Sequence, residues 1–235
     1  MSECFINENV QFFNKGVLIY VNTYEEAQIA KNANILSVIV LFDKEYNMAK
    51  LNLVLDIKNK LQLHCIVQAR KNNILETIFI NGCNADGIQL CIDDPNYTTD
   101  IINNNKYKLQ FLTNINTLSD AIFAIHSNCS LLKSGDEKCS IIDLKNIYDN
   151  VNKKLIEFHT FKNTNSINKF AKEKKIKKNI IENFAQFHRL PVPYIAEGMI
   201  KNPIDAVNIM RIGYDAIILS NDMFFTREPQ LMIKL

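Results

Sequence analysis

Hydrophobic residues in this chain gather in short, near-continuous runs, separated by longer stretches in which they recur every three or four positions. Near-continuous apolar runs, without regular polar alternation, are typical of parallel strands that are covered on both faces. There are eight such runs: Val17–Val21, Val38–Phe42, Leu63–Gln68, Gly87–Cys91, Lys108–Thr113, Cys129–Lys133, Val192–Ile195 and Ala216–Ser220. The pattern therefore predicts eight parallel strands.

The stretches between the runs carry helical signals. Thr23 and Glu26 have the spacing of a capping box, and Asn202 before Pro203 is typical of a helix start. A further helix is expected to begin at Pro203. The other predicted helices are Glu25–Asn32, Asn47–Lys60, Ile74–Gly82, Thr117–His126, Ile142–Phe158 and Ile167–Phe187.

Eight strands that alternate with helices predict an α/β fold, a (β/α)8 TIM barrel over residues 1–235, with residues 1–14 as an N-terminal extension. Two helices are expected as an insertion between strands six and seven. The C-terminal helix is expected to be truncated, because Asn221–Leu235 leaves little room for it. Uncovered apolar strand surface would favour a partner subunit. An open doubly wound sheet is disfavoured, because no strand is followed by a glycine-rich dinucleotide motif.

Composition limits the classes of partner and the cellular location expected for the chain. A formal net charge of +2 in 235 residues indicates neither a nucleic-acid nor a membrane partner. The six cysteines form no C-x-x-C motif, and several lie in apolar runs, which favours a reducing, cytoplasmic location. Lysines are concentrated in Asn168–Asn179. That stretch is either a solvated helix face or a patch for anionic ligands or an acidic partner.

Function in such a barrel resides at the C-terminal ends of the strands. No catalytic carboxylate pair, nucleophile–histidine set or metal-ligand cluster converges there by sequence, and no cofactor or metal ion is expected. Lys133 is the one candidate for covalent work, as a Schiff-base lysine or else as an ordinary ion-pair partner. Gly198 is the one glycine suited to an anion-binding turn, and Asp222 near the eighth strand would repel an anion.

Several segments resemble the PdxS/SNZ family, the synthase subunit of pyridoxal 5′-phosphate synthase. The match is carried by RLPVPYIAEG (189–198), NPIDA (202–206), MRIGYDAIILSND (210–222), KGVLIYV (15–21), EAQIAK (26–31) and VQAR (67–70). It covers about residues 14–229. The resemblance implies a vitamin B6 biosynthesis barrel that forms imines on two lysines in turn, assembles into rings and receives ammonia from a PdxT/SNO-type glutaminase.

Carried over residue by residue, the resemblance implies a catalytically impaired site. The family's first-strand aspartate falls on Tyr20, its two catalytic lysines fall on Gln68 and Gly135, and the acid that ends its fourth strand falls on Gln89. Lys133 takes the place of an arginine. The remnants of phosphate binding are Gly198, Ser220, Asn221 and Lys172.

Three functional hypotheses follow. The first is a pseudoenzyme that assembles with itself or with a catalytic PdxS/SNZ-type subunit and modulates it, with a doubtful link to the glutaminase. The second is a diverged Schiff-base or sugar-phosphate enzyme that uses Lys133, with Glu197 or Tyr20. The third is a binding module for phosphorylated metabolites around Gly198 and Lys172.

Overall fold

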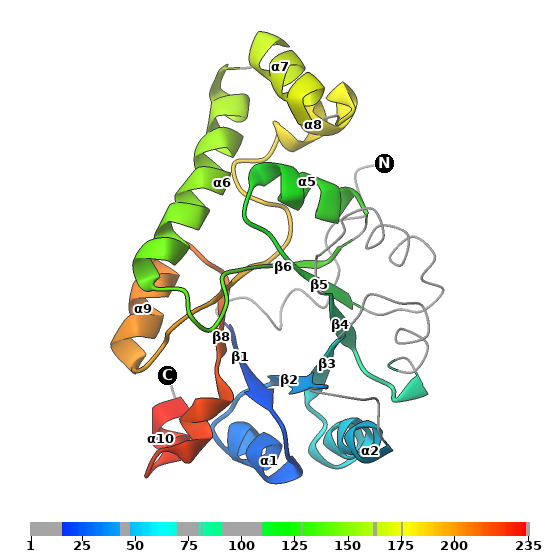
Figure 1. Cartoon of the computed structure of the whole chain (residues 1–235), viewed down its shortest axis with the longest axis vertical. Helices are drawn as coiled ribbons and strands as arrows, with labels where there is room; N and C mark the ends of the chain where they lie inside the picture. Colours follow the sequence, from blue (N-terminus) through cyan, green and yellow to red (C-terminus); the bar gives the residue numbers. More distant parts are fainter. Residues whose placement is uncertain are drawn as a thin grey trace.

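Eight parallel strands close into a barrel in which each strand pairs with the next along the chain and β8 returns to β1 (Figure 1). The computed structural model describes residues 16–42, 48–69, 80, 82–90, 110–127, 129–161, 164–174 and 176–233. The strands are β1 (Gly16–Val21), β2 (Ser37–Leu41), β3 (His64–Gln68), β4 (Gly87–Leu90), β5 (Gln110–Asn114), β6 (Leu131–Ser134), β7 (Tyr194–Glu197) and β8 (Ala216–Leu219). The (β/α)8 prediction is confirmed.

Helices surround the barrel where the sequence predicts them. They are α1 (Tyr24–Asn32), α2 (Met48–Asp56) followed by a π-helical turn η2 (Ile57–Leu61), α5 (Leu118–His126), α6 (Ile141–Phe161), α7 (Thr164–Lys174), α8 (Lys178–Phe184), α9 (Pro203–Ile212), a 3₁₀ turn η3 (Asn221–Phe225) and α10 (Pro229–Ile233). The N-terminal extension and nearly all of the expected helix Ile74–Gly82 lie outside the described residues. No helix in the ranges given above is long and apolar enough to cross a membrane.

The expected capping contacts are present. The hydroxyl of Thr23 accepts a hydrogen bond from the Glu26 amide at 3.2 Å, and the Glu26 carboxylate accepts from the Asn22 amide at 2.6 Å. Asn202 accepts from the Asp205 amide at 3.0 Å and so opens α9. These contacts satisfy amides that a helix leaves without partners in its first turn.

The insertion between β6 and β7 differs in detail from the prediction. The stretch Ile167–Phe187 was expected as one helix, but the structure divides it into α7 and α8. The amide of Ile176 bonds to the carbonyl of Ala171 at 3.1 Å, which ends α7 in the manner of a Schellman motif. Ile176 is buried, whereas Lys174 and Lys177 are exposed. Periodicity alone could not detect this break, because the apolar spacing continues through it.

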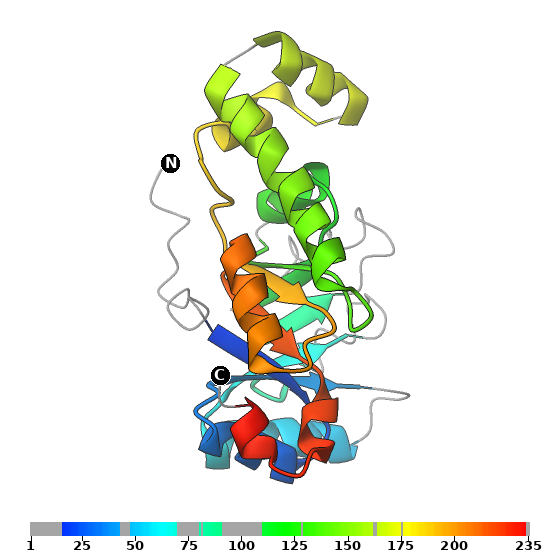
Figure 2. The same cartoon turned by 90° about the vertical axis from the view of Figure 1, so that its left-hand side faces the viewer.

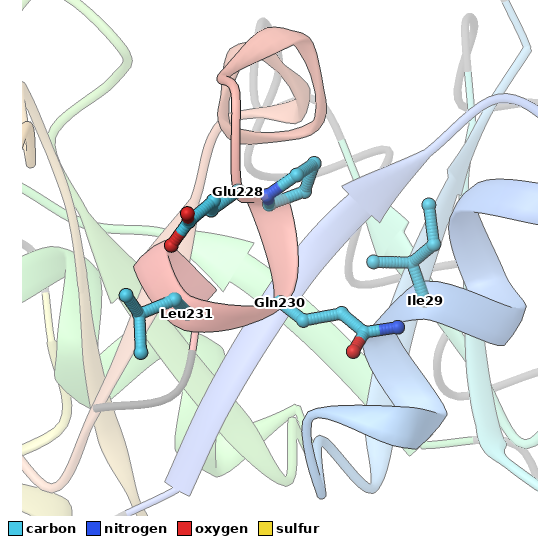
Figure 3. Close-up of a pocket in the computed structure, with 5 residues that line it drawn as sticks. Ile29, Glu228, Gln230 and Leu231 are labelled. Carbon is cyan, nitrogen blue, oxygen red and sulfur yellow. The ribbon is translucent and has the colours of Figure 1, made fainter.

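The truncated C-terminal helix is confirmed, since α10 contains five residues. It packs beside α1, and Ile233 is buried there. A cavity of about 370 Å³ remains between the two helices, lined by Ile29 of α1 and by residues 228–231 (Figure 3). Leu231 is 65% exposed at its edge. The exposed apolar group belongs to α10 itself, whereas β8 is buried along its whole length, so the uncovered strand surface expected from the sequence is not found at β8.

Two aspartates join neighbouring strands at the entry to the barrel. Asp215 stands directly before β8, accepts a hydrogen bond from the Tyr194 amide of β7 at 2.9 Å, and pairs with Arg189 at 2.6 Å. Asp86 stands directly before β4 and makes the corresponding contacts between β3 and β4. It accepts from the Cys65 amide of β3 at 2.7 Å and pairs with Lys58 at 2.7 Å. Each carboxylate thus fixes the start of one parallel strand against the next.

Asp215→Ala is expected to lower the free energy of unfolding by about 1.5–3 kcal/mol, because the variant leaves the Tyr194 amide without its charged acceptor. The measurement is urea unfolding followed by circular dichroism. Asp56→Ala is the matched control, since the pair of Asp56 with Lys60 is exposed on α2 and η2 and such pairs contribute at most about 1 kcal/mol. Equal losses in the two variants would contradict the role given to Asp215.

Candidate functional site

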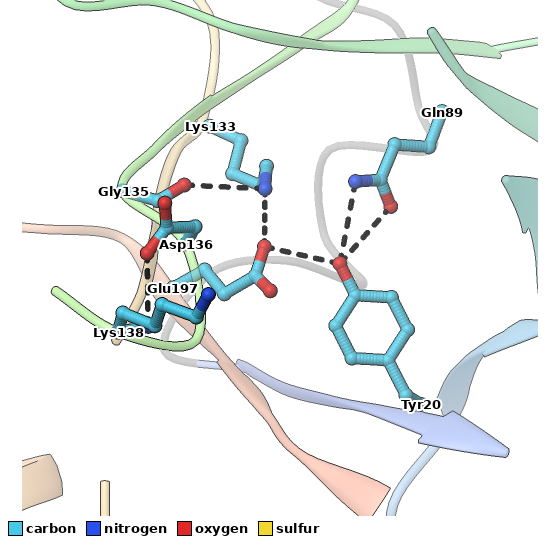
Figure 4. A network of polar contacts seen from close by, with 7 residues as sticks. All are labelled: Tyr20, Gln89, Lys133, Gly135, Asp136, Lys138 and Glu197. Atoms are coloured by element: carbon cyan, nitrogen blue, oxygen red, sulfur yellow. Dashed lines mark hydrogen bonds and ion pairs between the residues drawn. The ribbon is translucent and has the colours of Figure 1, made fainter. Parts of the chain in front are cut away.

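Four polar side chains from four different strands meet inside the C-terminal mouth of the barrel (Figure 4). They are Tyr20 of β1, Gln89 of β4, Lys133 of β6 and Glu197 of β7, and each is at most 7% exposed. Inward-pointing residues alternate along each strand, and the layer beneath these four is apolar. That layer comprises Leu18, Ile39, Ile66, Leu112, Leu131, Ile195 and Ile218. The mouth is therefore a polar layer on an apolar floor.

The four side chains form one connected network. The ammonium of Lys133 pairs with Oε2 of Glu197 and donates to the carbonyl of Gly135 at 3.3 Å. The Tyr20 hydroxyl donates to the same Glu197 oxygen at 3.0 Å. Gln89 Nε2 donates to the Tyr20 hydroxyl at 3.3 Å. The buried charges are thus paired and hydrogen-bonded within the chain, as burial of ionised groups demands.

This arrangement determines what Lys133 offers to a ligand. An imine-forming lysine needs an unprotonated amine whose lone pair faces the carbonyl carbon. The Glu197 carboxylate stabilises the charged ammonium of Lys133 instead, and Tyr20 holds that carboxylate in place. Of the two roles predicted for Lys133, the structure shows the ion pair.

Gln68 and Gly135, the positions on which the resemblance places the family's two catalytic lysines, carry no nucleophilic side chain. Gln68 ends β3 and pairs in register with Gln89 on β4, so both amides stand at the mouth. Gly135 follows β6 with a φ of +80°, a backbone conformation that favours glycine. A β-carbon at Gly135 would overlap the carbonyl oxygen of Glu197 and approach Leu144.

The predicted phosphate remnants are only partly brought together. Gly198 and Ser220 line one cavity of about 460 Å³ beside the mouth, together with Lys138, Lys201 and Asp222. The two lysines were not singled out from the sequence, because nothing in their spacing marks them. Glu137 lines the cavity as well, so the two lysines are balanced by two carboxylates, those of Glu137 and Asp222.

The other two predicted remnants, Lys172 and Asn221, do not line this cavity. Lys172 is exposed on α7. Asn221 is the first residue of the turn η3. The hydroxyl of Ser220 caps this turn by accepting a hydrogen bond from the Asp222 amide at 3.3 Å.

Gly198 also has a packing role. A β-carbon there would lie 2.7 Å from Leu144 Cδ1 and 2.8 Å from the carbonyl oxygen of Cys139. The absence of a side chain lets the loop after β7 approach the loop after β6, and the Met199 amide bonds to that same carbonyl at 2.8 Å. Close approach of two loops therefore accounts for this glycine without any phosphate.

Other buried titratable groups have structural roles. Burial raises the pKa of Tyr194 to about 12 and that of the Cys129 thiol to about 12, so both keep their protons at neutral pH. The Tyr214 hydroxyl lies 2.7 Å from the Ser134 hydroxyl and donates to the Leu144 carbonyl at 2.9 Å. Cys65, Cys129 and Cys139 are free thiols. Among the described residues, no three side chains are grouped as metal ligands.

Comparisons with known proteins agree with this geometry. The SOR/SNZ family model matches residues 5–197. The sequence is 22% identical to the pyridoxal 5′-phosphate synthase subunit SNZ1 of Saccharomyces cerevisiae, over 93% of this chain and 78% of that protein. It is 23% identical to the subunit Pdx1 of Plasmodium berghei (92% and 77%) and to the subunit PdxS of Clostridium botulinum (97% and 83%).

One solved structure shows the same fold. Thiamine phosphate pyrophosphorylase from Pyrococcus furiosus superposes with a TM-score of 0.63 at 14% identity, over 96% of this chain and 95% of that one. At that identity the likeness concerns the fold alone.

Proposed function

The chain belongs to the SOR/SNZ family, the vitamin B6 family of pyridoxal 5′-phosphate synthase subunits, and from this premise we propose that it is a non-catalytic member that assembles with a catalytic synthase subunit and modulates it. One observation carries the proposal. The two positions expected to form imines hold Gln68 and Gly135, and the lysine that the described structure places in the network, Lys133, is ion-paired to Glu197.

The energetic argument concerns the catalytic unit as a whole. Removal of one member of such a unit costs several orders of magnitude in rate, and the losses do not need to add. Here the positions expected for the nucleophiles carry an amide and a glycine, and the position expected for an acid, at the end of β1, carries the phenol of Tyr20. The Lys133 and Glu197 charges are paired with each other, and Tyr20 and Gln89 bond within the same network, without a substrate.

The wider setting is part of the same proposal. The partner is a catalytic PdxS/SNZ-type subunit, or further copies of this chain in a ring, in the cytoplasm. No cofactor or metal ion is required. A contact with a PdxT/SNO-type glutaminase is not needed for a modulatory role, because ammonia has no acceptor in a site that forms no imine.

The decisive experiment is formation of pyridoxal 5′-phosphate in vitro from a pentose phosphate, a triose phosphate and ammonia. The purified chain alone is expected to give no product above the protein-free blank. Co-expressed with a catalytic synthase subunit, the chain is expected to elute together with it on gel filtration. The mixed assembly is expected to form pyridoxal 5′-phosphate at a different rate from the catalytic subunit alone. Turnover by the chain alone, or clean separation of the two proteins, would contradict the proposal.

A second candidate function is favoured by the neighbours of Lys133. Glu197 touches the amine and Tyr20 touches Glu197, so proton transfer from the ammonium to the carboxylate would leave a nucleophilic amine. That amine would add to an aldehyde or ketone, and Glu197 would return the proton as the carbinolamine loses water. The cavity at Gly198 would offer Lys138 and Lys201 to an anionic group of such a carbonyl compound, although Glu137 and Asp222 line the same cavity and balance their charge.

Borohydride trapping separates the two candidates. The chain is incubated with glycolaldehyde, ribose 5-phosphate or glyceraldehyde 3-phosphate, reduced, and analysed by intact mass and peptide mapping, with Lys133→Met as the control. A reduced adduct on Lys133 supports the second candidate. Labelling spread over exposed lysines, equal in Lys133→Met, leaves the non-catalytic proposal in place.

A further inference from the structure

The cavity beside the barrel mouth carries charges of both signs in equal number. It has a volume of about 460 Å³ and is formed by the segments that follow β6, β7 and β8, together with α10. Glu137 and Lys138 belong to the loop after β6. Lys201 precedes α9, and Asp222 lies in the turn η3. Figures 1 and 2 show the start of α9 beside η3 and α10, so these walls come from neighbouring elements. The volume lies within the range of about 300–1,000 Å³ that is typical of small-molecule sites.

The four charged side chains of this cavity are exposed and do not pair with one another. Among the residues that the structure describes, the ion pairs lie elsewhere, and none of them includes a group of the cavity. Two amines and two carboxylates that stand on neighbouring segments without pairing remain open to a ligand. A ligand that carries both signs would give each of them a partner.

The backbone of the cavity is poorly suited to phosphate. Phosphate sites in barrels expose backbone amides in loops and at helix N-termini. Here the amides of Met199, Ile200 and Lys201 donate to acceptors of the chain itself at 2.8, 2.8 and 2.9 Å. The Asp222 amide donates to the Ser220 hydroxyl at 3.3 Å. A phosphate group would find none of these four amides free and would also face two carboxylates.

The buried part of the lining is largely apolar. Ile200 and Met223 are 6% and 7% exposed, and Met232 of α10 is half-buried. Methionine side chains are flexible and adapt to apolar groups of different shapes. The Thr226 hydroxyl donates to the Met223 carbonyl at 3.0 Å and so fixes the chain between η3 and α10. The short C-terminal helix thereby provides one apolar wall of the cavity.

We propose that this cavity binds a zwitterionic α-amino acid with an apolar side chain, such as leucine or methionine. The two lysines bind the carboxylate of the ligand, and the two carboxylates of the cavity bind its ammonium group. The side chain of the ligand packs on Ile200 and the methionines. The proposal goes beyond the proposed function, since it concerns a ligand site outside the Lys133–Glu197 network and does not depend on imine chemistry or on a catalytic partner.

Isothermal titration calorimetry of the wild-type chain tests the proposal with L-leucine and two analogues that each lack one charge. Isoamylamine has the side chain and the ammonium group, and 4-methylpentanoate has the side chain and the carboxylate. Leucine is expected to bind, and each analogue is expected to bind more weakly by about tenfold or more. Glycine, which has both charges but no side chain, is also expected to bind more weakly than leucine. Ribose 5-phosphate is included as the phosphorylated competitor and is expected to bind less tightly than leucine.

Matched variants assign the binding to the cavity. Glu137→Gln/Asp222→Asn removes both of its carboxylates, and Lys138→Gln/Lys201→Gln removes both of its amines. Each is expected to weaken leucine binding by about tenfold or more.

The control Asp149→Asn/Glu157→Gln makes the same change of charge as the first variant, on exposed positions of α6 outside the cavity, and is expected to bind leucine as the wild type does. Circular dichroism first establishes that the three variants are folded.

Several results would overturn the proposal, and those obtained with the wild type do not depend on any variant. They are no binding of leucine at millimolar concentration, an analogue with one charge that binds as tightly as leucine, and tighter binding of ribose 5-phosphate than of leucine. Equal affinity for leucine in the cavity variants and the control would do the same. Each of these results would leave the non-catalytic proposal standing, because formation of pyridoxal 5′-phosphate is measured separately.

Discussion

Glu197→Ala is expected to lower the free energy of unfolding by about 3–5 kcal/mol, because it leaves the Lys133 ammonium buried without a counter-charge. Lys133 and Glu197 are 6% and 7% exposed, so water cannot replace the lost carboxylate without opening the barrel mouth. The same substitution removes the acceptor of the Tyr20 hydroxyl. Urea unfolding monitored by circular dichroism measures the loss.

A matched control comes from an exposed pair of the same kind. Glu182→Ala removes the carboxylate that pairs with Lys178 at 3.2 Å on α8, and it is expected to cost no more than about 1 kcal/mol. The double variant Lys133→Met/Glu197→Leu is expected to recover most of the stability, since replacement of both ions by apolar groups is often neutral. A Glu197→Ala protein as stable as the wild type would show that the pair is not desolvated.

The fold was predictable from the sequence because each strand can be recognised from its own few residues. Val38–Phe42 is wholly apolar and Leu63–Gln68 is largely so, as is typical of strands covered on both faces. The capping residues Thr23 and Asn202 mark helix starts by themselves. These signals depend on neighbours within a few positions. The division of α7 from α8 depends instead on one backbone hydrogen bond at Ile176, which apolar spacing does not encode.

The candidate site was predictable residue by residue but not as a network. Tyr20, Gln89, Lys133 and Glu197 were each recognisable as strand-end positions. Which of them touch depends on barrel register and side-chain direction: Tyr20 and Glu197 are 177 positions apart and are joined by one hydrogen bond across the mouth. The resemblance implied lost nucleophiles at Gln68 and Gly135. The structure adds that Lys133 at the same mouth is ion-paired to Glu197, which accepts a hydrogen bond from Tyr20, itself bonded to Gln89.

Gly135→Lys, the substitution that would return a lysine to the second expected catalytic position, is predicted to destabilise the chain and to restore no activity. Gly135 has a φ of +80°, which costs a residue with a side chain about 1–2 kcal/mol. Its β-carbon would also overlap the Glu197 carbonyl oxygen and press on Leu144. We expect a total loss of about 3 kcal/mol or more, since overpacking adds a further 1–3 kcal/mol.

The comparison with Gln68→Lys makes this prediction specific. Gln68 ends β3 in ordinary strand conformation and is half-buried. A lysine at this position is therefore expected to lower the free energy of unfolding less than Gly135→Lys does. Borohydride trapping with ribose 5-phosphate then reports whether the new amine at the mouth is reactive. Thermal unfolding of both single variants and of the double variant distinguishes two explanations for the missing lysines: loss of the side chains alone, or a change in the backbone around them. If Gly135→Lys folds with wild-type stability, the backbone after β6 still accommodates a catalytic lysine and the site has lost only side chains. If it is as unstable as predicted, the loop after β6 and the end of β7 have closed on each other, and catalysis cannot be regained by restoring the two lysines alone.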